Sequence, residues 1–284
     1  MNIVITDLSY TYDLNSPTAF NALSEISLDI PAGQTVGLLG ATGSGKSTLA
    51  QHLNGLLIPQ TGSIRFGELE ITKGKQIPRQ IRQKIGLVFQ FAEFGFFEET
   101  VFDEVAFSPR QWGWTEDQAR ERTLQALDQI GFPLELARTR SPFALSGGQQ
   151  RMVALASVLV MQPEVLILDE PTAGLDAAAR ARIRNAIHSL KAADRTVMVI
   201  SHDMDFVASL VDRVVILGDG RIVGDGRASE ILSDQGLLSQ AGLEPPAVIR
   251  LRDRLLQLGI PDMHASFDTF EVREMLRNRG RRSY

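Results

Sequence analysis

The chain has 284 residues, 44% of them hydrophobic and 22% charged, which is typical of a globular protein with one large domain and an appendage. Its net charge of −5 provides no basic field for nucleic acid, and the absence of cysteine excludes disulfide scaffolds and fits a reducing cytosol. The longest apolar run, 153–161, is far shorter than the roughly 20 residues of a spanning helix. The first residues also lack a signal-peptide pattern. We therefore expect any membrane role to depend on a partner.

The chain begins with segments of alternating polarity that turn at glycines. They cover residues 2–12, 26–30 and 63–72 and predict an antiparallel sheet at the start and edge of the fold. An apolar strand is predicted at 36–40, followed by a helix through Leu49, Leu53 and Leu56. Similar strands are predicted at 84–90, 165–170, 196–202 and 213–218. Helices between such strands are typical of an α/β fold with a mainly parallel sheet buried on both faces.

A glycine-rich sequence, GATGSGKST at 40–48, joins the strand at 36–40 to the helix that follows. It fits G-x-x-x-x-G-K-[ST], in which backbone N–H groups and a helix N-terminus hold phosphate oxygens. Lys46 is expected to reach the β and γ phosphates, and the Ser47 hydroxyl to bind Mg²⁺. The predicted nucleotide-binding residues are Gly40, Ala41, Thr42, Gly43, Ser44, Gly45, Lys46, Ser47 and Thr48.

Residues 89–100, FQFAEFGFFEET, combine phenylalanines with glutamates. Acidic groups buried beside rings are costly unless they are paired. Rings beside carboxylates can instead form a groove for a partner helix that carries arginine. Core rings with solvated glutamates are the alternative, and we expect some of both, with Phe89 and Phe97 turned inward. The predicted groove residues are Glu93, Phe94, Phe96, Phe97, Glu98 and Glu99.

Helical patterns replace strands between about 100 and 160, which predicts a helical subdomain inserted between two strands. Within it, LSGGQ precedes an apolar helix. Ser146 can cap that helix, and its hydroxyl and the exposed N–H groups can also form a second anion site. The two interpretations are compatible. The residues of this second site are Leu145, Ser146, Gly147, Gly148 and Gln149.

The strand at 165–170 ends in two carboxylates. Asp169 emerges beside the phosphate cradle, where a Mg²⁺ ligand is required. Glu170 points differently by strand alternation and can hold an attacking water in line. The two neighbours are therefore expected to divide metal binding and general-base catalysis between them.

Pro245 and Pro246 open a separate tail. Apolar residues recur there at helical spacing, and a second short helix is predicted at 267–278. The leucine stripe is too apolar to stand free, so the tail is expected to pack against its counterpart in a partner subunit and form a dimer contact. The basic end, 277–284, is interpreted as a solvated terminus, with a charged-lipid contact as the alternative.

These motifs, in this order, resemble the nucleotide-binding subunits of ABC transporters over most of residues 1–240. The resemblance rests on GATGSGKST, Gln90 at a strand end, LSGGQ, VLILDE, AGLD at 173–176 and His202 in ISHD. It implies an α/β P-loop cassette at 1–240 with its helical signature subdomain at about 100–160, and a helical extension at 241–284. It also implies a head-to-tail dimer in which ATP lies between the cradle of one subunit and the LSGGQ of the other.

The same resemblance implies roles for four further residues. Tyr12 would stack on adenine, Gln90 would contact Mg²⁺ and water, and His202 would contact the γ-phosphate. Tyr12 could otherwise be an ordinary strand aromatic, and His202 a strand-end histidine bonded to a loop. Asp176 has an interface role by resemblance and a helix-capping role by its position, and both can hold.

Residues 88–109, LNGLLIPQTG at 53–62 and the tail beginning EPPAVIRLRDRLLQLGI resemble the energy-coupling factor transporter ATPases, particularly their second (A-prime) subtype. Ala92 and Gly95 depart from the pattern, where Pro and Gln are usual. The subtype implies a paralogous ATPase partner, a transmembrane coupling protein and membrane subunits that capture vitamins or metal ions. The protein would then lie at the cytoplasmic face of the cell membrane.

Two alternatives remain open from the sequence. A cobalt or nickel importer with a single ATPase type is the nearest, and the transported substrate would in either case bind another polypeptide. A translation or chromosome ATPase of the same superfamily is less consistent, because the chain has one cassette and no sustained heptads between Lys46 and LSGGQ.

Overall fold

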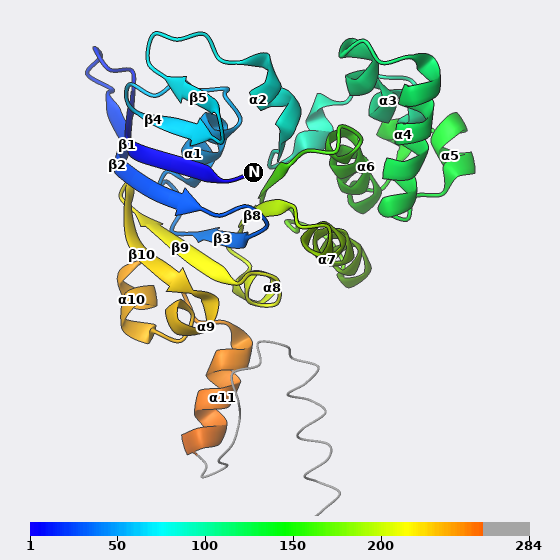
Figure 1. Ribbon diagram of the computed structural model, residues 1–284. Coiled ribbons are helices and arrows are strands. Elements are labelled where there is room, and N and C mark those ends of the chain that lie inside the picture. Colours follow the sequence, from blue (N-terminus) through cyan, green and yellow to red (C-terminus); the bar gives the residue numbers. More distant parts are fainter. Residues whose placement is uncertain (258–284) are drawn as a thin grey trace, which may run out of the picture.

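The computed structural model describes residues 1–257, and it has two sheets beside a group of helices (Figure 1). The first sheet is antiparallel, in the order β2-β1-β4-β5. Its strands are β1 (Ile3–Tyr12), β2 (Phe20–Ile30), β4 (Thr61–Phe66) and β5 (Leu69–Thr72). The alternating, glycine-punctuated segments thus form the antiparallel sheet that their pattern predicts.

The second sheet has six strands in the order β10-β9-β3-β8-β7-β6. Every neighbouring pair in it is parallel except β9 with β10. Its strands are β3 (Thr35–Leu39), β6 (Ile85–Val88), β7 (Val165–Asp169), β8 (Thr196–Ile200), β9 (Arg213–Gly218) and β10 (Arg221–Arg227). All residues of β3, β7 and β8 are buried, as continuous apolar strands in a sheet covered on both faces require.

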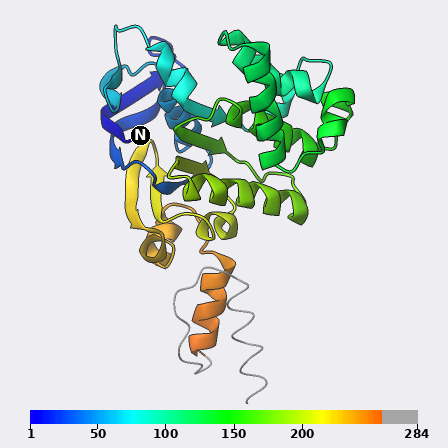
Figure 2. The ribbon, with the colours of Figure 1, turned by 45° about the vertical axis from the view of Figure 1, so that its right-hand side comes forward.

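The helices of residues 101–159 stand to one side of both sheets, and the two ribbon views agree on this (Figures 1 and 2). They are α3 (Val101–Gln111), α4 (Glu116–Gln129), α5 (Leu134–Thr139) and α6 (Gly147–Leu159). Short 3-10 turns at Ala92–Gly95 and Pro142–Ala144 lead into α3 and α6. The apolar faces of α3, α4 and α6 share one core, which continues under the six-stranded sheet.

The remaining helices pack around the sheets or follow them. They are α1 (Lys46–Leu53), α2 (Arg79–Lys84), α7 (Ala177–Ala192), α8 (Met204–Ala208), α9 (Ala228–Ile231), α10 (Gln235–Gln240) and α11 (Ala247–Gln257). Helix α1 ends at Leu53, so the prediction that it runs through Leu56 is wrong. The helix ends here because Gly55, two residues after Leu53, has a positive φ of 73°. Leu56 lies beyond this point and is exposed.

Helix α11 contains the predicted apolar repeat up to residue 257. Val248 and Ile249 are buried, and the N–H of Ala247 donates to a carboxylate oxygen of Asp205 on α8 at 2.6 Å. Leu251 is exposed. The helix predicted at 267–278 lies outside the described residues. Within the described part of the chain, no helix has the length and apolarity needed to cross a membrane.

Candidate nucleotide site

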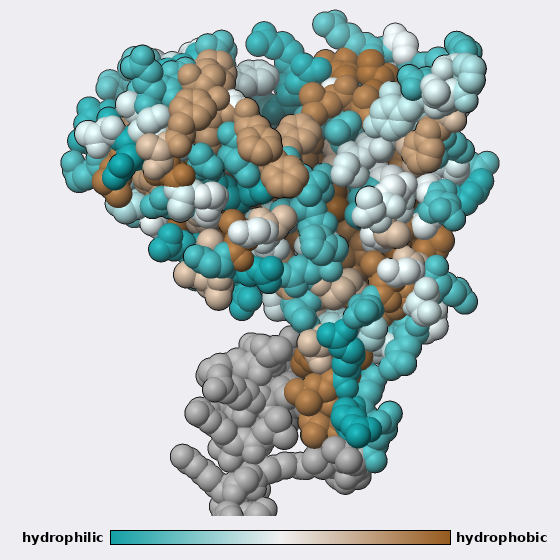
Figure 3. Space-filling model, turned by 180° about the vertical axis from the view of Figure 1, so that it is seen from behind, coloured by the Kyte–Doolittle hydropathy of each residue, from teal (hydrophilic) through white to brown (hydrophobic). Residues whose placement is uncertain are grey.

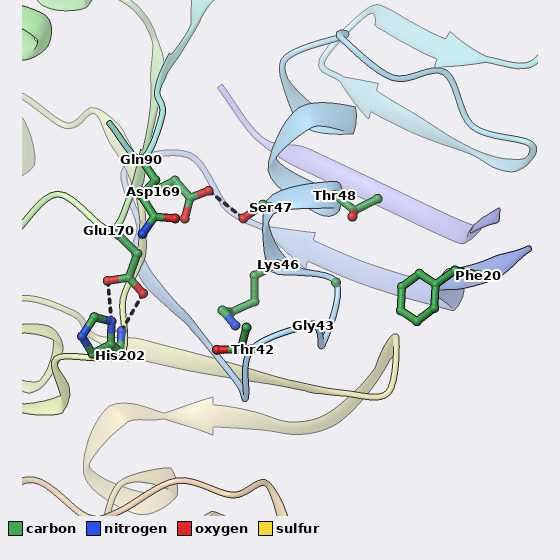
Figure 4. Close-up of a pocket in the computed structure, with 11 residues that line it drawn as sticks. Phe20, Thr42, Gly43, Lys46, Ser47, Thr48, Gln90, Asp169, Glu170 and His202 are labelled. Carbon is green, nitrogen blue, oxygen red and sulfur yellow. Dashed lines mark hydrogen bonds and ion pairs between the residues drawn. The ribbon is translucent and has the colours of Figure 1, made fainter. Parts of the chain in front are cut away.

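The parallel strands bring the predicted site residues to one edge of the six-stranded sheet. The loop at 40–48 follows β3, Gln90 follows β6, Asp169 ends β7 and His202 follows β8. These segments enclose a cavity of about 410 Å³ (Figure 4). It is lined by Phe20, Thr42, Gly43, Gly45, Lys46, Ser47, Thr48, Gln90, Asp169, Glu170 and His202.

The glycine-rich loop has the geometry of an anion cradle. Gly45 has a φ of 103°, and a Cβ there would lie 2.5 Å from the Ala22 carbonyl oxygen, so only glycine fits. Gly43 has a φ of 83° and open space around it. The first N–H groups of α1 therefore face the cavity without side-chain caps, and the helix N-terminus favours negative charge there.

Gly40, Ala41 and Ser44 belong to this loop but do not line the cavity. They hold Lys46 instead. Its ammonium donates to the carbonyl oxygens of Gly40 and Ala41, at 2.8 Å each, and to the Ser44 hydroxyl at 3.4 Å. Burial lowers the pKa of Lys46, while the nearby carboxylates of Glu170 and Asp169 oppose this shift.

Ser47 and Asp169 meet across the cavity. The Ser47 hydroxyl donates to Asp169 Oδ2 at 2.7 Å, and Asp169 is 6% exposed. Burial raises the pKa of Asp169, the hydrogen bond from Ser47 and the charge of Lys46 oppose this, and the charge of Glu170 adds to it.

These oxygens fit Mg²⁺, a hard cation that prefers carboxylate and hydroxyl ligands and keeps several waters. The amide of Gln90 lines the same cavity (Figure 4). The described residues contain no group of three or more His, Asp and Glu side chains able to hold a metal by themselves. An ion held here would therefore need phosphate or water oxygens in addition to the protein's ligands.

Glu170 forms a unit with the residues after β8. Its Oε1 accepts the backbone N–H of His202 at 3.0 Å, and its Oε2 accepts the Ser201 hydroxyl at 3.1 Å. The imidazole Nδ1 of His202 lies 2.9 Å from Oε2 (Figure 4). Glu170 lies just beyond β7 with a φ of 50°, so a left-handed turn sets its direction rather than strand alternation. It does point away from Asp169, toward His202.

Tyr12 does not line the cavity, although the family resemblance implies that it stacks on adenine. Its hydroxyl lies 3.3 Å from the Thr48 hydroxyl, and its ring packs edge-on against Tyr10. Phe20, its partner in the β1–β2 register, lines the cavity instead and is 54% exposed. Sequence reasoning missed Phe20. Its position directly across the hairpin from an expected base-stacking residue is the signal that could have found it.

The LSGGQ segment lies outside this cavity. Ser146 caps α6 by accepting the N–H of Gln149, and the Gln149 side chain returns a bond to the Ser146 N–H, which completes a capping box. Leu145 is half-buried, Ser146 and Gly147 are exposed, and Gly148 lies close to Ala179. Asp176 caps α7 through the Ala179 N–H at 2.8 Å. Both predicted helix caps are therefore confirmed.

The rings of the 89–100 segment face differently from the prediction. Phe96 is 8% exposed and packs in the core, whereas Phe89 and Phe97 are exposed at 39% and 57%. The inward orientation predicted for Phe89 and Phe97 is wrong, and Phe96 is not available to a surface groove. A 3-10 turn at 92–95 replaces strand alternation here and determines which ring turns inward.

Four rings of this segment are exposed, and we refer to them together as the aromatic patch: Phe89, Phe91, Phe94 and Phe97. Phe94 is 83% exposed and stacks on Phe91 with a centroid separation of 5.7 Å. Figure 3 shows apolar rings gathered at the upper surface of the face seen from behind. Glu99 is exposed and Glu98 half-buried, whereas Glu93 is paired inside the chain with Arg151 at 3.3 Å. Glu93 therefore differs from the other two predicted groove glutamates.

Comparison with known proteins places this geometry in a family. The model of the ABC transporter family matches residues 23–173. Curated relatives named energy-coupling factor transporter ATP-binding protein EcfA2 include one from Symbiobacterium thermophilum, 44% identical over 91% of this chain and 90% of its own length. Another, from Streptococcus pyogenes, is 41% identical over 98% of this chain and 100% of its own length.

Solved structures agree with the sequence relatives. One is cbiO1 from Clostridium perfringens, described as part of the ABC transporter complex cbiONQ, with a TM-score of 0.71 and 32% identity over 88% of this chain and 98% of that one. Another is a dimeric ATP-binding cassette in a post-hydrolysis state bound to ADP and Pi, with a TM-score of 0.71 and 26% identity over 80% of this chain and 98% of that one. This chain therefore belongs to the ABC transporter ATPases, and within them to the second-subtype ATP-binding and ATP-hydrolysing subunits of energy-coupling factor transporters.

Proposed function

We propose that this subunit supplies one half of each of two ATP sites in a head-to-tail dimer with a paralogous ATPase. Its own cavity would hold the phosphates of one ATP, and its LSGGQ segment would contact the ATP of the partner. The observation that carries the proposal is that the LSGGQ segment lies apart from the cavity of the same chain. Ser146 and the exposed start of α6 lie outside the cavity, although the segment has the N–H groups of an anion site. The cavity would be completed only by a second subunit.

Within the cavity, one set of side chains would bind the nucleotide phosphates and Mg²⁺, and another would carry out hydrolysis. Lys46 and the N–H groups of the loop bind the β and γ phosphates, and Ser47, Asp169 and Gln90 would hold Mg²⁺. Bound Mg²⁺ supplies neutralisation of the charge that develops on the phosphate oxygens.

The pair formed by Glu170 and His202 would carry the hydrolytic step. Glu170 orients the attacking water and accepts its proton at the carboxylate, and its bonds to His202 and Ser201 fix the direction of that carboxylate. His202 is 77% exposed toward the cavity mouth, where its imidazole can donate to the γ-phosphate. His202 contacts Glu170 and would also contact the γ-phosphate. It can therefore couple the orientation of the Glu170 carboxylate to the presence of that phosphate.

The membrane partner would contact the aromatic patch. Its exposed rings can pack against the stem of an arginine side chain, and Glu98 or Glu99 can pair with the guanidinium. The complex would then take up vitamins or other micronutrients, with this subunit held at the cytoplasmic face of the membrane by a transmembrane coupling protein and a membrane substrate-binding subunit. No role in nucleic-acid binding is proposed. A cobalt or nickel importer with a single ATPase type is kept from the sequence alternatives as the second candidate.

The catalytic part is tested with Glu170→Gln in the assembled complex, where the base of the partner ATPase is also neutralised. We expect ATP binding to persist and turnover to fall by about a thousandfold or more, because the water loses its proton acceptor. Glu164→Gln is the matched control, since that carboxylate pairs with Lys84 away from the cavity. Unchanged hydrolysis by Glu170→Gln would refute the assignment.

The membrane part is tested by purification of the complex from detergent-solubilised membranes. We expect two different ATPase chains and a transmembrane protein to co-elute, whereas two copies of this chain would favour the cobalt or nickel type. Changing both Glu98 and Glu99 to Ala is expected to weaken assembly. Full assembly by this variant would refute the contact through carboxylates.

A further inference from the structure

Arg151 joins two segments that the proposed function treats separately. It lies on α6, in the second turn after Ser146, and its side chain is 3% exposed. One guanidinium nitrogen, Nη1, donates to the Phe89 carbonyl oxygen at 3.2 Å, and the other, Nη2, donates to Glu93 Oε1 at 3.3 Å. The guanidinium also lies over the Phe91 ring, 5.8 Å from its centroid. A single side chain of the signature helix therefore holds residues 89–93.

The segment that Arg151 holds includes Gln90 and bends sharply directly after it. Phe91 has a φ of 59°, in the left-handed region that a bulky aromatic residue adopts only when its surroundings impose it. The contacts of Arg151 fall on the residues on either side of Phe91 and on its ring. They account for the persistence of this bend.

Arg151 and Glu93 form one of the two hydrogen bonds that a guanidinium and a carboxylate can share, so we call the ion pair half-made. Arg151 Nε and Glu93 Oε2 are both buried, and neither has a hydrogen-bond partner among residues 1–257. Buried polar atoms without partners are rare and costly. Nε and Nη2 are the two donors on one side of the guanidinium, and Nη2 already bonds the same carboxylate. A small approach of Glu93 would therefore give the bidentate arrangement and satisfy both atoms at once.

We propose that Arg151 is a positioning residue that couples Gln90 to the LSGGQ helix through this half-made pair. When residues 89–94 move toward α6, the second bond forms, and Gln90 and Ser146 shift as one unit. The proposal rests on the proposed function, in which Gln90 serves the ATP of this subunit and Ser146 serves that of the partner. The pair would then link the two ATP sites and act beneath the aromatic patch that the membrane partner contacts.

The test uses the complete transporter complex with Arg151→Lys and, separately, Glu93→Gln. Lysine keeps the charge but lacks the fork, and glutamine keeps one acceptor but presents an N–H₂ group to Nε. We expect each variant to lower the kcat of ATP hydrolysis by about tenfold, with KM for ATP within about twofold of the wild type, because ATP contacts are untouched. The double variant is expected to lose no more than either single one.

Arg110→Lys is the matched control, because Arg110 forms ion pairs with Asp103 and Glu116 inside the same group of helices without touching residues 89–94. Hydrogen exchange with a non-hydrolysable ATP analogue gives a second readout. Protection of residues 89–97 is expected to rise on binding in the wild type and the control, but not in Arg151→Lys.

Wild-type kcat in both Arg151→Lys and Glu93→Gln, measured in a complex that Glu170→Gln inactivates, would overturn the proposal and leave the proposed function standing. A strictly additive double variant would also overturn it. If Glu170→Gln itself leaves turnover unchanged, the proposed function fails first. A purely structural role predicts a lower melting temperature with unchanged kcat, and that result counts against the proposal.

Discussion

Replacing Phe20 with alanine should weaken nucleotide binding by the isolated chain. Phe20 lies at the opposite end of the cavity from Glu170 and His202 (Figure 4), where the base of a nucleotide would lie if its phosphates reach Lys46. Stacking of a base on an aromatic side chain contributes about 1–3 kcal/mol. Because Phe20 is already 54% exposed, its ring can be covered by a base without moving core residues.

Since Phe20 stays partly exposed to solvent in the free chain, we expect the lower part of that range, about 1–2 kcal/mol, or roughly a 5- to 30-fold rise in the Kd for ATP. Phe20→Tyr keeps the ring and should bind ATP as the wild type does. The exposed position also predicts an unchanged melting temperature for the alanine variant.

The assay is calorimetric titration of the isolated chain with ATP, repeated with Tyr12→Ala. Tyr12 lies beside Thr48 rather than on the cavity wall, so its loss should affect Kd less than the loss of Phe20 does. The opposite order, with wild-type affinity in Phe20→Ala and a large loss in Tyr12→Ala, would refute this reasoning. It would restore the role that the family resemblance implies for Tyr12.

Substitutions at three further residues test separate features of the chain. Glu104→Ala should lower the free energy of unfolding in urea by about 2–4 kcal/mol, because Glu104 is 7% exposed and its carboxylate accepts the N–H groups of Phe97 and Glu98. Glu104→Gln keeps an acceptor and should lower it less. Asp169→Asn should raise the melting temperature at neutral pH while abolishing turnover. Burial raises the pKa of Asp169, so the native state binds its proton more tightly than the unfolded chain, and ionisation costs stability as pH rises through that pKa. The rise in melting temperature should vanish when unfolding is measured below the usual carboxyl pKa. A rise that does not change with pH would show that ionisation of Asp169 is not its cause. Ser146→Ala should lower stability by about 1 kcal/mol through the lost helix cap, without changing ATP affinity in the isolated chain, because Ser146 lies outside the cavity.

Much of the phosphate end of the site could be predicted because it is local in sequence. Lys46 and Ser47 sit in a nine-residue motif whose backbone geometry follows from its glycines, and Asp169 ends a strand that can only be buried. Such features need no knowledge of distant contacts. The α/β fold and the inserted helices followed for the same reason, from apolar runs and helical spacing.

The parts that could not be predicted depend on contacts across the chain. Arg151 and Glu93 are 58 positions apart, and no periodic pattern connects them. The orientation of the 89–97 rings depends on the left-handed residue Phe91 and the 3-10 turn, which remove the alternation on which the prediction relied. Phe20 becomes visible only through its register with Tyr12.

The order of strands in the six-stranded sheet has a further consequence for the resistance of the protein to proteolysis. Strand β3 pairs with β8 although four strands lie between them in the chain, and long helical segments separate β6, β7 and β8 in sequence. The loops at the ends of these four strands each carry part of the nucleotide site. A partly folded chain therefore has no such site, and a nucleotide selects only the fully paired sheet. ATP at a hundred times its Kd would stabilise the folded chain by about 2.7 kcal/mol. The resistance of the subunit to proteolysis should accordingly follow the energy charge of the cell.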